Sequence, residues 1–214
     1  GMLRSEYQKR GVNFHLNAKV IEVGKEGVTI EKEGKTARIE AEKVLVSVGR
    51  KANLSQVGLD KLNIELLRNG VKVDEHMQTS HPRVYACGDI TGHSMLAHTA
   101  IRESEVAVNH ILGVEDRMNY DCVPGVVYTN PEVAGVGKTE EELKASGISY
   151  HVQKLPMAYS GRFVAENELV NGLCKLILDD DDRVIGCHML GNPVSELIVL
   201  AGLAVQHGYT LSLI

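Results

Sequence analysis

Hydrophobic and polar positions alternate through the first part of the chain, after a short helical pattern. Residues 3–10 predict the end of a surface helix, which Gly11 stops. The alternation that follows predicts short strands over residues 12–16, 18–23, 27–33 and 35–40. Polar turns containing glycine separate the later runs, so antiparallel hairpins are expected here.

Two later runs are almost continuously apolar and each ends in glycine. The first covers residues 43–50, with Gly49 near its end, and the second covers residues 83–87 and precedes Gly88. A strand without alternation is usually buried on both faces, so both runs predict strands inside a parallel or mixed sheet. The apolar spacing over residues 95–112 then predicts a long helix.

The rest of the chain alternates strand and helix patterns. Strands are expected over residues 126–129, 133–136 and 149–155, and a hairpin over residues 172–178 and 183–190. Thr139 and Glu142 have the spacing of a capping box, which predicts a helix from there to about Ser146. Residues 195–207 are apolar almost all round, so this helix is expected to be buried, in our interpretation against another subunit.

The patterns together predict an α/β (α+β) chain with more than one domain. A polar stretch over residues 114–121 follows the long helix and marks the expected start of the last domain. We therefore divide the chain into residues 1–50, 51–118 and 119–214.

Composition narrows the classes of partner. Hydrophobic residues make up 43% and charged residues 24% of the chain, as in ordinary globular proteins. The formal net charge of −5 argues against a nucleic-acid partner, which would need a basic surface. The chain has no apolar run near the roughly 18 residues that a membrane span requires.

The four cysteines, Cys87, Cys122, Cys174 and Cys187, are too far apart in sequence for a metal knuckle or a local redox dithiol. We interpret them as reduced thiols of a cytoplasmic protein, and we predict no metal site. Four consecutive aspartates at 179–182 fall between two predicted strands, where a solvated turn is expected more than a cation site.

Candidate chemistry lies at the Gly88–Asp89 pair and the helix that follows it. Asp89 comes directly after an apolar run, where an α/β sheet exposes its ligand-binding edge. A carboxylate there can accept hydrogen bonds from sugar or ribityl hydroxyls. The Met95-Leu96-Ala97-His98 stretch opens the long helix, whose free N–H groups suit a pyrophosphate or an electron-rich ring oxygen. An aspartate near a helix start is also often only a cap.

Three motifs in order resemble the pyridine nucleotide–disulfide oxidoreductases. They are Ser47-Val48-Gly49-Arg50, then Val84-Tyr85-Ala86-Cys87-Gly88-Asp89, then Met95-Leu96-Ala97-His98. The stretch from Tyr120 to Ala134 is similar to the start of that family's interface domain. Within the family, Met-Leu-Ala-His resembles the dihydrolipoamide dehydrogenases more than glutathione or mercuric reductases.

The resemblance implies cofactor contacts at seven positions. Asp89 would hold the ribityl chain of FAD, and the four residues Met95, Leu96, Ala97 and His98 would contact the flavin and its phosphates. Gly49 and Val20 would lie beside NAD, although plain strand packing is an equal explanation for Val20. A cap or packing role is the better interpretation of His98 than a catalytic base.

The resemblance also implies the division of domains and what this sequence lacks. Residues 1–50 would end an NAD-binding domain, 51–118 would be a central FAD-contacting segment, and 119–214 a truncated dimerisation domain. The family's Cys-x-x-x-x-Cys redox pair does not occur here, and we expect the chain to stop at Ile214 before the family's C-terminal His-Pro pair and its nearby glutamate. We therefore expect a C-terminal fragment with no catalytic residue, inactive alone and retaining neither FAD nor NAD.

The complete enzyme implied by the resemblance would pass electrons from dihydrolipoamide through a disulfide and FAD to NAD⁺. Its expected partners are a second copy, bound through residues 119–214, and a lipoyl-bearing acyltransferase complex. Two alternatives stay open: a non-enzymatic dimerisation module, or part of another NAD(P)H-dependent disulfide reductase of the glutathione or mercuric type.

Overall fold

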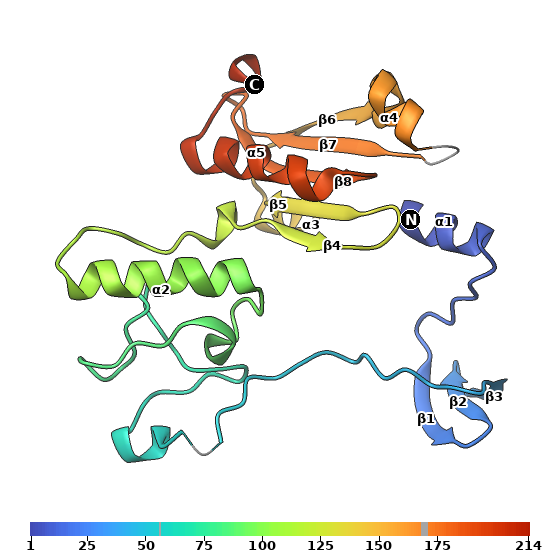
Figure 1. Ribbon diagram of the computed structural model, residues 1–214, viewed down its shortest axis with the longest axis horizontal. Coiled ribbons are helices and arrows are strands. Elements are labelled where there is room, and N and C mark those ends of the chain that lie inside the picture. The colour runs from blue at the N-terminus through green and yellow to red at the C-terminus, as the bar shows by residue number, and fades with distance from the viewer. Residues whose placement is uncertain (56, 168–170) are drawn as a thin grey trace. The chain divides into compact units, whose positions relative to one another are not determined.

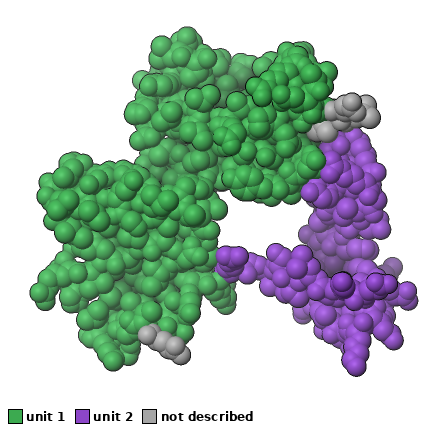
Figure 2. Space-filling model, viewed as in Figure 1, with its two compact units in different colours: residues 1–3, 51–214 green, residues 4–50 purple. Residues whose placement is uncertain are grey.

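The computed structural model spans residues 1–214 and describes all of them except residues 56 and 168–170. The chain divides into two compact units, which are coloured separately in Figure 2. Unit 2 comprises residues 4–50, and unit 1 comprises residues 1–3 and 51–214. Each unit is considered by itself below.

Unit 2 is built on a three-stranded antiparallel sheet that follows helix α1 (Met2–Lys9). Strands β1 (Lys19–Gly24), β2 (Gly27–Lys32) and β3 (Lys35–Glu40) pair in chain order, as the hairpin turns predicted. Every residue of β1 is exposed, whereas Ile30 in β2 is 7% exposed. The predicted strand over residues 12–16 is wrong, because this stretch is turn and irregular backbone.

The apolar run at residues 43–50 is not the buried strand that its sequence predicted. It is an irregular segment in which the side chains of Leu45 and Val48 are each 92% exposed. None of the described strands pairs with it. An apolar run becomes a buried strand only where neighbouring strands supply hydrogen bonds and cover, and the described residues supply neither.

The first part of unit 1 packs against one face of the long helix α2 (Ala97–Ile111), which was predicted two residues longer at its start and one at its end. Residues 83–87 run under this helix as irregular backbone, so the predicted second buried strand is wrong. A single bridge between Gln78 and Tyr85 is the pairing found there. Burial still occurs through side chains, because Met77, Val106, Ala107 and Met118 form a small core.

The second part of unit 1 is a five-stranded antiparallel sheet in the order β4-β5-β8-β7-β6 (Figure 1). Its strands agree closely with the predicted ones: β4 (Gly125–Val127), β5 (Val133–Gly137), β6 (His151–Pro156), β7 (Leu173–Leu178) and β8 (Val184–Leu190). The Asp179–Asp182 stretch joins β7 to β8 as a turn, in which Asp179 Oδ1 accepts hydrogen bonds from the backbone N–H groups of Asp181 and Arg183.

Three helices accompany this sheet. Helix α3 (Glu140–Ser146) begins at the predicted capping box, with Thr139 and Glu142 each bonded to the other's backbone N–H. Helix α4 (Gly161–Glu166) has no counterpart among the predicted elements. Helix α5 (Val194–His207) packs on β5 and β8 over a core that includes Val136, Cys187 and Ile198.

Helix α5 is buried on one side only within the single chain, and the expected cover of its other side by another subunit stays a prediction. Ile198 is 1% exposed, whereas Leu200 is 67% exposed. The other exposed apolar side chains of this helix are Leu197, Val199 and Leu203. The sheet is a single layer beneath the helix, so it covers one face and leaves a row of apolar side chains on the other.

Candidate functional site

The Gly88–Asp89 pair starts a single turn of 3₁₀ helix, Gly88–Thr91, that packs against α2. Gly88 has a φ of 78°, in the left-handed region that favours glycine. The hydroxyl of Thr91 donates to the carbonyl oxygen of Gly88 at 3.0 Å and closes the turn. Asp89 is exposed, and its carboxylate accepts no hydrogen bond from the described side chains. A free carboxylate on a fixed turn is suited to bind hydroxyl groups.

The backbone beneath this turn is closely packed. A methyl group on Gly70 would lie 2.3 Å from the carbonyl oxygen of Thr91, and one on Gly92 would lie 2.3 Å from that of Asn69. The N–H of Val71 also donates to the carbonyl of Ile90 at 2.9 Å. Gly70 and Gly92 therefore let the two backbone segments pack directly against each other. This contact fixes the position of the turn that carries Asp89 relative to residues 69–71.

The N-terminus of α2 is exposed and lacks a side-chain cap. Its N-cap residue is Leu96, which has no side chain able to accept from the first N–H groups. Leu96, Ala97 and His98 are exposed, and Met95 is half-buried. The first-turn N–H groups carry partial positive charge, so this end of a fifteen-residue helix can receive an anionic group.

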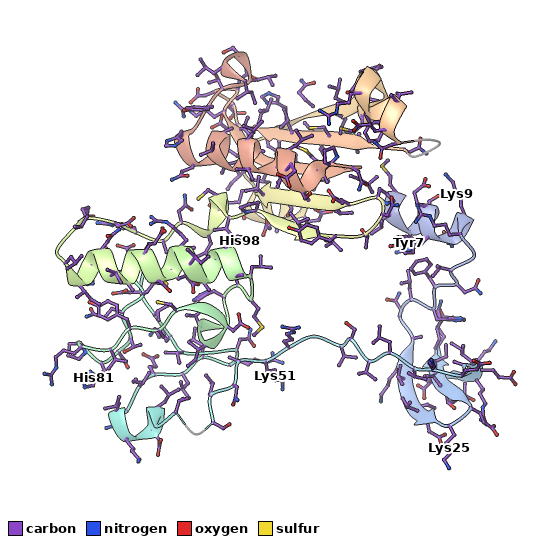
Figure 3. All side chains as sticks on the ribbon, viewed as in Figure 1. Tyr7, Lys9, Lys25, Lys51, His81 and His98 are labelled. Atoms are coloured by element: carbon purple, nitrogen blue, oxygen red, sulfur yellow. The ribbon has the colours of Figure 1, made fainter. Side chains whose placement is uncertain are left out.

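His98 is tied to the segment that leads into the five-stranded sheet. Its Nε2 donates to the carbonyl oxygen of Pro124 at 2.8 Å. His98 is labelled in Figure 3. The contact uses one ring nitrogen for a structural link, in keeping with the packing role preferred from the sequence.

Glu103 and Tyr120 belong to this site and were missed in the sequence. The Glu103 carboxylate is 0% exposed and accepts from the backbone N–H of Gly88 and from the hydroxyl of Tyr120. A glutamate that stands beside Arg102 and near Glu105 in a helix gives no sign of burial in the sequence. Its spacing of four from the buried Thr99, on one helix face, is the signal that could have found it.

The two predicted NAD positions lie in unit 2. Val20 is on β1 with 56% of its side chain exposed. Gly49 is in the irregular segment, with a φ of 101° and open space where a side chain would be. A groove in the same unit is lined by neither residue but by Lys25, Glu26, Glu40, Ala41 and Glu42. The cofactor roles of Val20 and Gly49 stay predictions.

All four cysteines are free thiols. Cys174 and Cys187 face the same core from the neighbouring strands β7 and β8. A hydrogen bond from the Cys187 thiol lowers the pKa of Cys174 to about 7, and the same bond raises the pKa of Cys187. Among the residues described, no three histidine, cysteine, aspartate or glutamate side chains are placed to hold a metal ion. The described part of the chain also has no helix of the length and hydropathy needed to cross a membrane.

The chain combines a glycine–aspartate turn beside an open helix end with an antiparallel sheet domain that follows it. Two family models match these two parts and together cover nearly the whole chain, which places the chain in a class of oxidoreductases. The model described as "Pyridine nucleotide-disulphide oxidoreductase" matches residues 1–104, and the model of that family's dimerisation domain matches residues 123–214. The chain belongs to the pyridine nucleotide-disulphide oxidoreductase family.

Curated relatives are dihydrolipoyl dehydrogenases. The chain is 39% identical over 208 residues to the mitochondrial dihydrolipoyl dehydrogenase of Caenorhabditis elegans, covering 94% of this chain and 42% of that protein. It is 40% identical over 211 residues to the mitochondrial enzyme of Dictyostelium discoideum, covering 94% and 43%. The match to the Vibrio cholerae enzyme is 40% over 203 residues, covering 92% and 42%. The chain thus spans less than half the length of these relatives.

Solved structures give the same fold. LpdA from Mycobacterium tuberculosis superposes with a TM-score of 0.86 at 29% identity, covering 98% of this chain and 46% of LpdA. The HOCl-induced flavoprotein disulfide reductase RclA from Escherichia coli superposes with a TM-score of 0.81 at 24% identity, covering 99% and 49%, and shows likeness of fold alone.

The comparisons correct the expected location. Reduced cysteines suggested a cytoplasmic protein, but the similar proteins of Caenorhabditis elegans, Dictyostelium discoideum and Bos taurus are named as mitochondrial. Free thiols persist in any reducing compartment, so cysteine usage could not distinguish the two.

Proposed function

We propose that this chain supplies part of the FAD site, part of the NAD site and the dimerisation domain of a dihydrolipoamide dehydrogenase. The FAD part is the Asp89 turn and the start of α2. The observation that carries the proposal is the free, exposed carboxylate of Asp89 on a turn packed beside the uncapped N-terminus of α2. An acceptor for hydroxyl groups and a donor for an anion stand next to each other, which is the pairing that a flavin dinucleotide needs.

The residues fit FAD in chemistry as well as position along the chain. Asp89 would accept from ribityl hydroxyls, while the backbone N–H groups after Met95 and Leu96 would receive phosphate or flavin oxygens. Ala97 presents only a methyl group, so a ring can approach the helix end closely. His98 would stay on its Pro124 link and hold the helix end in place.

Gly49 and Val20 would contact NAD. Gly49 would let the nucleotide approach the backbone closely, because no side chain intervenes and its φ of 101° excludes most other residues. Val20 would offer an exposed aliphatic surface to an adenine ring.

When bound, FAD would supply the two-electron chemistry that connects a dithiol to NAD⁺. The chain's own residues orient the cofactor and supply no group that exchanges electrons with a thiol substrate. The sequence contains no Cys-x-x-x-x-Cys pair, and its His81-Pro82 pair lies before the dimerisation domain with no glutamate in the residues that follow it closely. We therefore propose that the 214-residue chain alone does not oxidise dihydrolipoamide and purifies without flavin.

The proposed partners are a second copy of the chain, docked through the dimerisation domain, and a lipoyl-bearing acyltransferase complex that presents the substrate. The exposed apolar side of α5 supports the first of these. The second rests on the similarity to dihydrolipoyl dehydrogenases. A reductase of the glutathione or mercuric type that uses NADPH is the alternative enzyme.

The test is a titration of the flavin-free chain with FAD, in which the quenching of flavin fluorescence reports binding. Weak saturable binding is expected, and Asp89→Ala should weaken it about tenfold, whereas Asp60→Ala at an exposed position of a short 3₁₀ helix should leave it unchanged. Equal quenching by wild type and Asp89→Ala would contradict the proposed site. A chain that forms dimers but never binds FAD would favour the alternative of a pure dimerisation module.

A further inference from the structure

A fully buried carboxylate lies behind the candidate FAD turn. Glu103 is 0% exposed, and none of the described lysine, arginine or histidine side chains forms an ion pair with it. Burying a carboxylate is costly unless hydrogen-bond donors replace the lost water. Both oxygens of Glu103 have such a donor: Oε2 receives the backbone N–H of Gly88 at 2.5 Å, and Oε1 receives the hydroxyl of Tyr120 at 2.7 Å.

One of these donors begins the turn that carries Asp89. The N–H of Gly88 is directed into Glu103, and a methyl group on Gly88 would lie 3.2 Å from the Cβ of Ala100. Glu103 and Ala100 are three residues apart on the same face of α2. The start of the turn is therefore held against the helix by a charge-assisted hydrogen bond and by close packing.

Tyr120 contacts one end of the same loop directly and reaches the other end through Glu103. Through Glu103 its hydroxyl acts on Gly88, and its ring stacks on the ring of His93, with centroids 5.1 Å apart and planes 27° apart. His93 follows directly after the Gly88–Thr91 turn and Gly92. Burial, and next the hydrogen bond to Glu103, raise the pKa of Tyr120, so its hydroxyl keeps its proton and remains a donor.

Tyr120 is also where the chain enters the domain matched to dimerisation, which begins at residue 123. It sits in a short turn, Tyr120–Cys122, that packs against β5 and α5. The Tyr120 side chain thus links the Tyr120–Cys122 turn, which packs against the sheet domain, to the loop that carries Asp89.

We propose that Glu103 and Tyr120 are positioning residues that hold the Asp89 loop in its cofactor-binding shape and couple this shape to the dimerisation domain. The inference rests on the proposed function, since it takes Asp89 to be an FAD ligand. Neither residue touches the reacting atoms; each acts through the Gly88–His93 backbone.

The first test needs no cofactor. Tyr120→Phe removes the hydroxyl but keeps the ring on His93, and Tyr85→Phe is the matched control, because the Tyr85 hydroxyl contacts His110 Nδ1 at 2.8 Å in the same unit. Amide hydrogen exchange of the 214-residue chain should rise about tenfold at residues 88–93 in Tyr120→Phe, by loss of a hydrogen bond to a charged group. Tyr85→Phe should leave those amides unchanged. The Gly88 amide proton, deshielded by its short bond to the carboxylate, should also move upfield in Glu103→Gln.

Unchanged exchange at residues 88–93 in Tyr120→Phe would overturn the coupling. An equal rise in exchange in both tyrosine variants would also overturn it, because such a rise would mean a general loss of stability.

The second test measures FAD affinity by fluorescence quenching. Tyr120→Phe should weaken it about tenfold, and its effect should vanish on an Asp89→Asn background, because the two act on one contact. Full additivity in this cycle would overturn the positioning role. Failure of the wild-type chain to bind FAD, with the exchange result as expected, would instead overturn the proposed function.

Discussion

Arg102 and Asp116 form a two-armed ion pair between helix α2 and the loop that follows it. Arg102 Nη1 lies 2.8 Å from Asp116 Oδ2, and Arg102 Nη2 lies 2.5 Å from Asp116 Oδ1. The amide of Asn109 donates to the same carboxylate at 2.7 Å. These donors, the Arg102 hydrogen bond first, lower the pKa of Asp116 to about 2 from its ordinary 3.8. The pair fixes the return of the chain from α2 toward Tyr120.

Acid should therefore loosen unit 1 in a defined pH window. A carboxyl group with a lowered pKa in the folded state adds stability above its unfolded pKa of 3.8, and this stability is lost as the pH falls through about 2. Asp116→Asn should lower stability at pH 7 by about 1 kcal/mol after solvent screening, and flatten the dependence between pH 4 and pH 2. Urea unfolding followed by circular dichroism at several pH values would measure both effects. Asp121→Asn, which breaks an exposed pair with Lys138, is the control and should change stability by less than about 0.5 kcal/mol. An unaltered acid profile in Asp116→Asn would contradict this account.

The exposed face of α5 should mediate self-association. Leu200→Asp places a charge on an apolar side chain that is 67% exposed in the single chain. Sedimentation equilibrium is expected to show a dimer for the wild type and a monomer for this variant, because a charge at the centre of an apolar interface is costly. Val164→Asp, on the exposed side of α4, should remain a dimer. Dimerisation that survives Leu200→Asp would place the interface elsewhere.

Gly70→Ala should destabilise the loop under Asp89. The added methyl group would meet the backbone of Thr91 at 2.3 Å, and backbone cannot move aside as a side chain can. Overpacking of this kind costs about 1–3 kcal/mol. Gly125→Ala is the matched control, because nothing lies within 4 Å of its added methyl group. Thermal unfolding monitored by circular dichroism should separate the two; similar midpoints would show that the loop adjusts freely.

Local signals predicted the strands of the sheet domain well and the structure around Asp89 and residues 43–50 poorly. The capping box of Thr139 and Glu142 and the β7–β8 hairpin depend on neighbours a few residues away, so spacing alone revealed them. Residues 43–50 could form a buried strand only beside neighbouring strands, which the described residues do not provide. Their apolar sequence is the same whether the segment is covered or exposed. The hydrogen bond between Glu103 and Tyr120 joins two residues that are 17 positions apart, so the local sequence pattern does not predict it.

The exposed segment at residues 43–50 should make the chain prone to association. Val46 is 68% exposed in a β-branched run that contains no proline, which is a template for added strands. Val46→Lys should reduce light scattering at high protein concentration. Leu112→Lys adds the same charge at a 70% exposed position that ends a helix, and should have little effect. Equal reductions in both variants would indicate a simple effect of net charge.

The hydrogen bonds to Glu103 also determine when the Asp89 loop can fold during translation. Gly88 leaves the ribosome before the helix that carries Glu103, and Tyr120 emerges last of the three. The Asp89 loop can therefore reach its final shape only after the entrance to the sheet domain has been translated. A nascent chain halted within α2 would contain the sequence of the Asp89 loop but not the contacts that give the loop its native conformation.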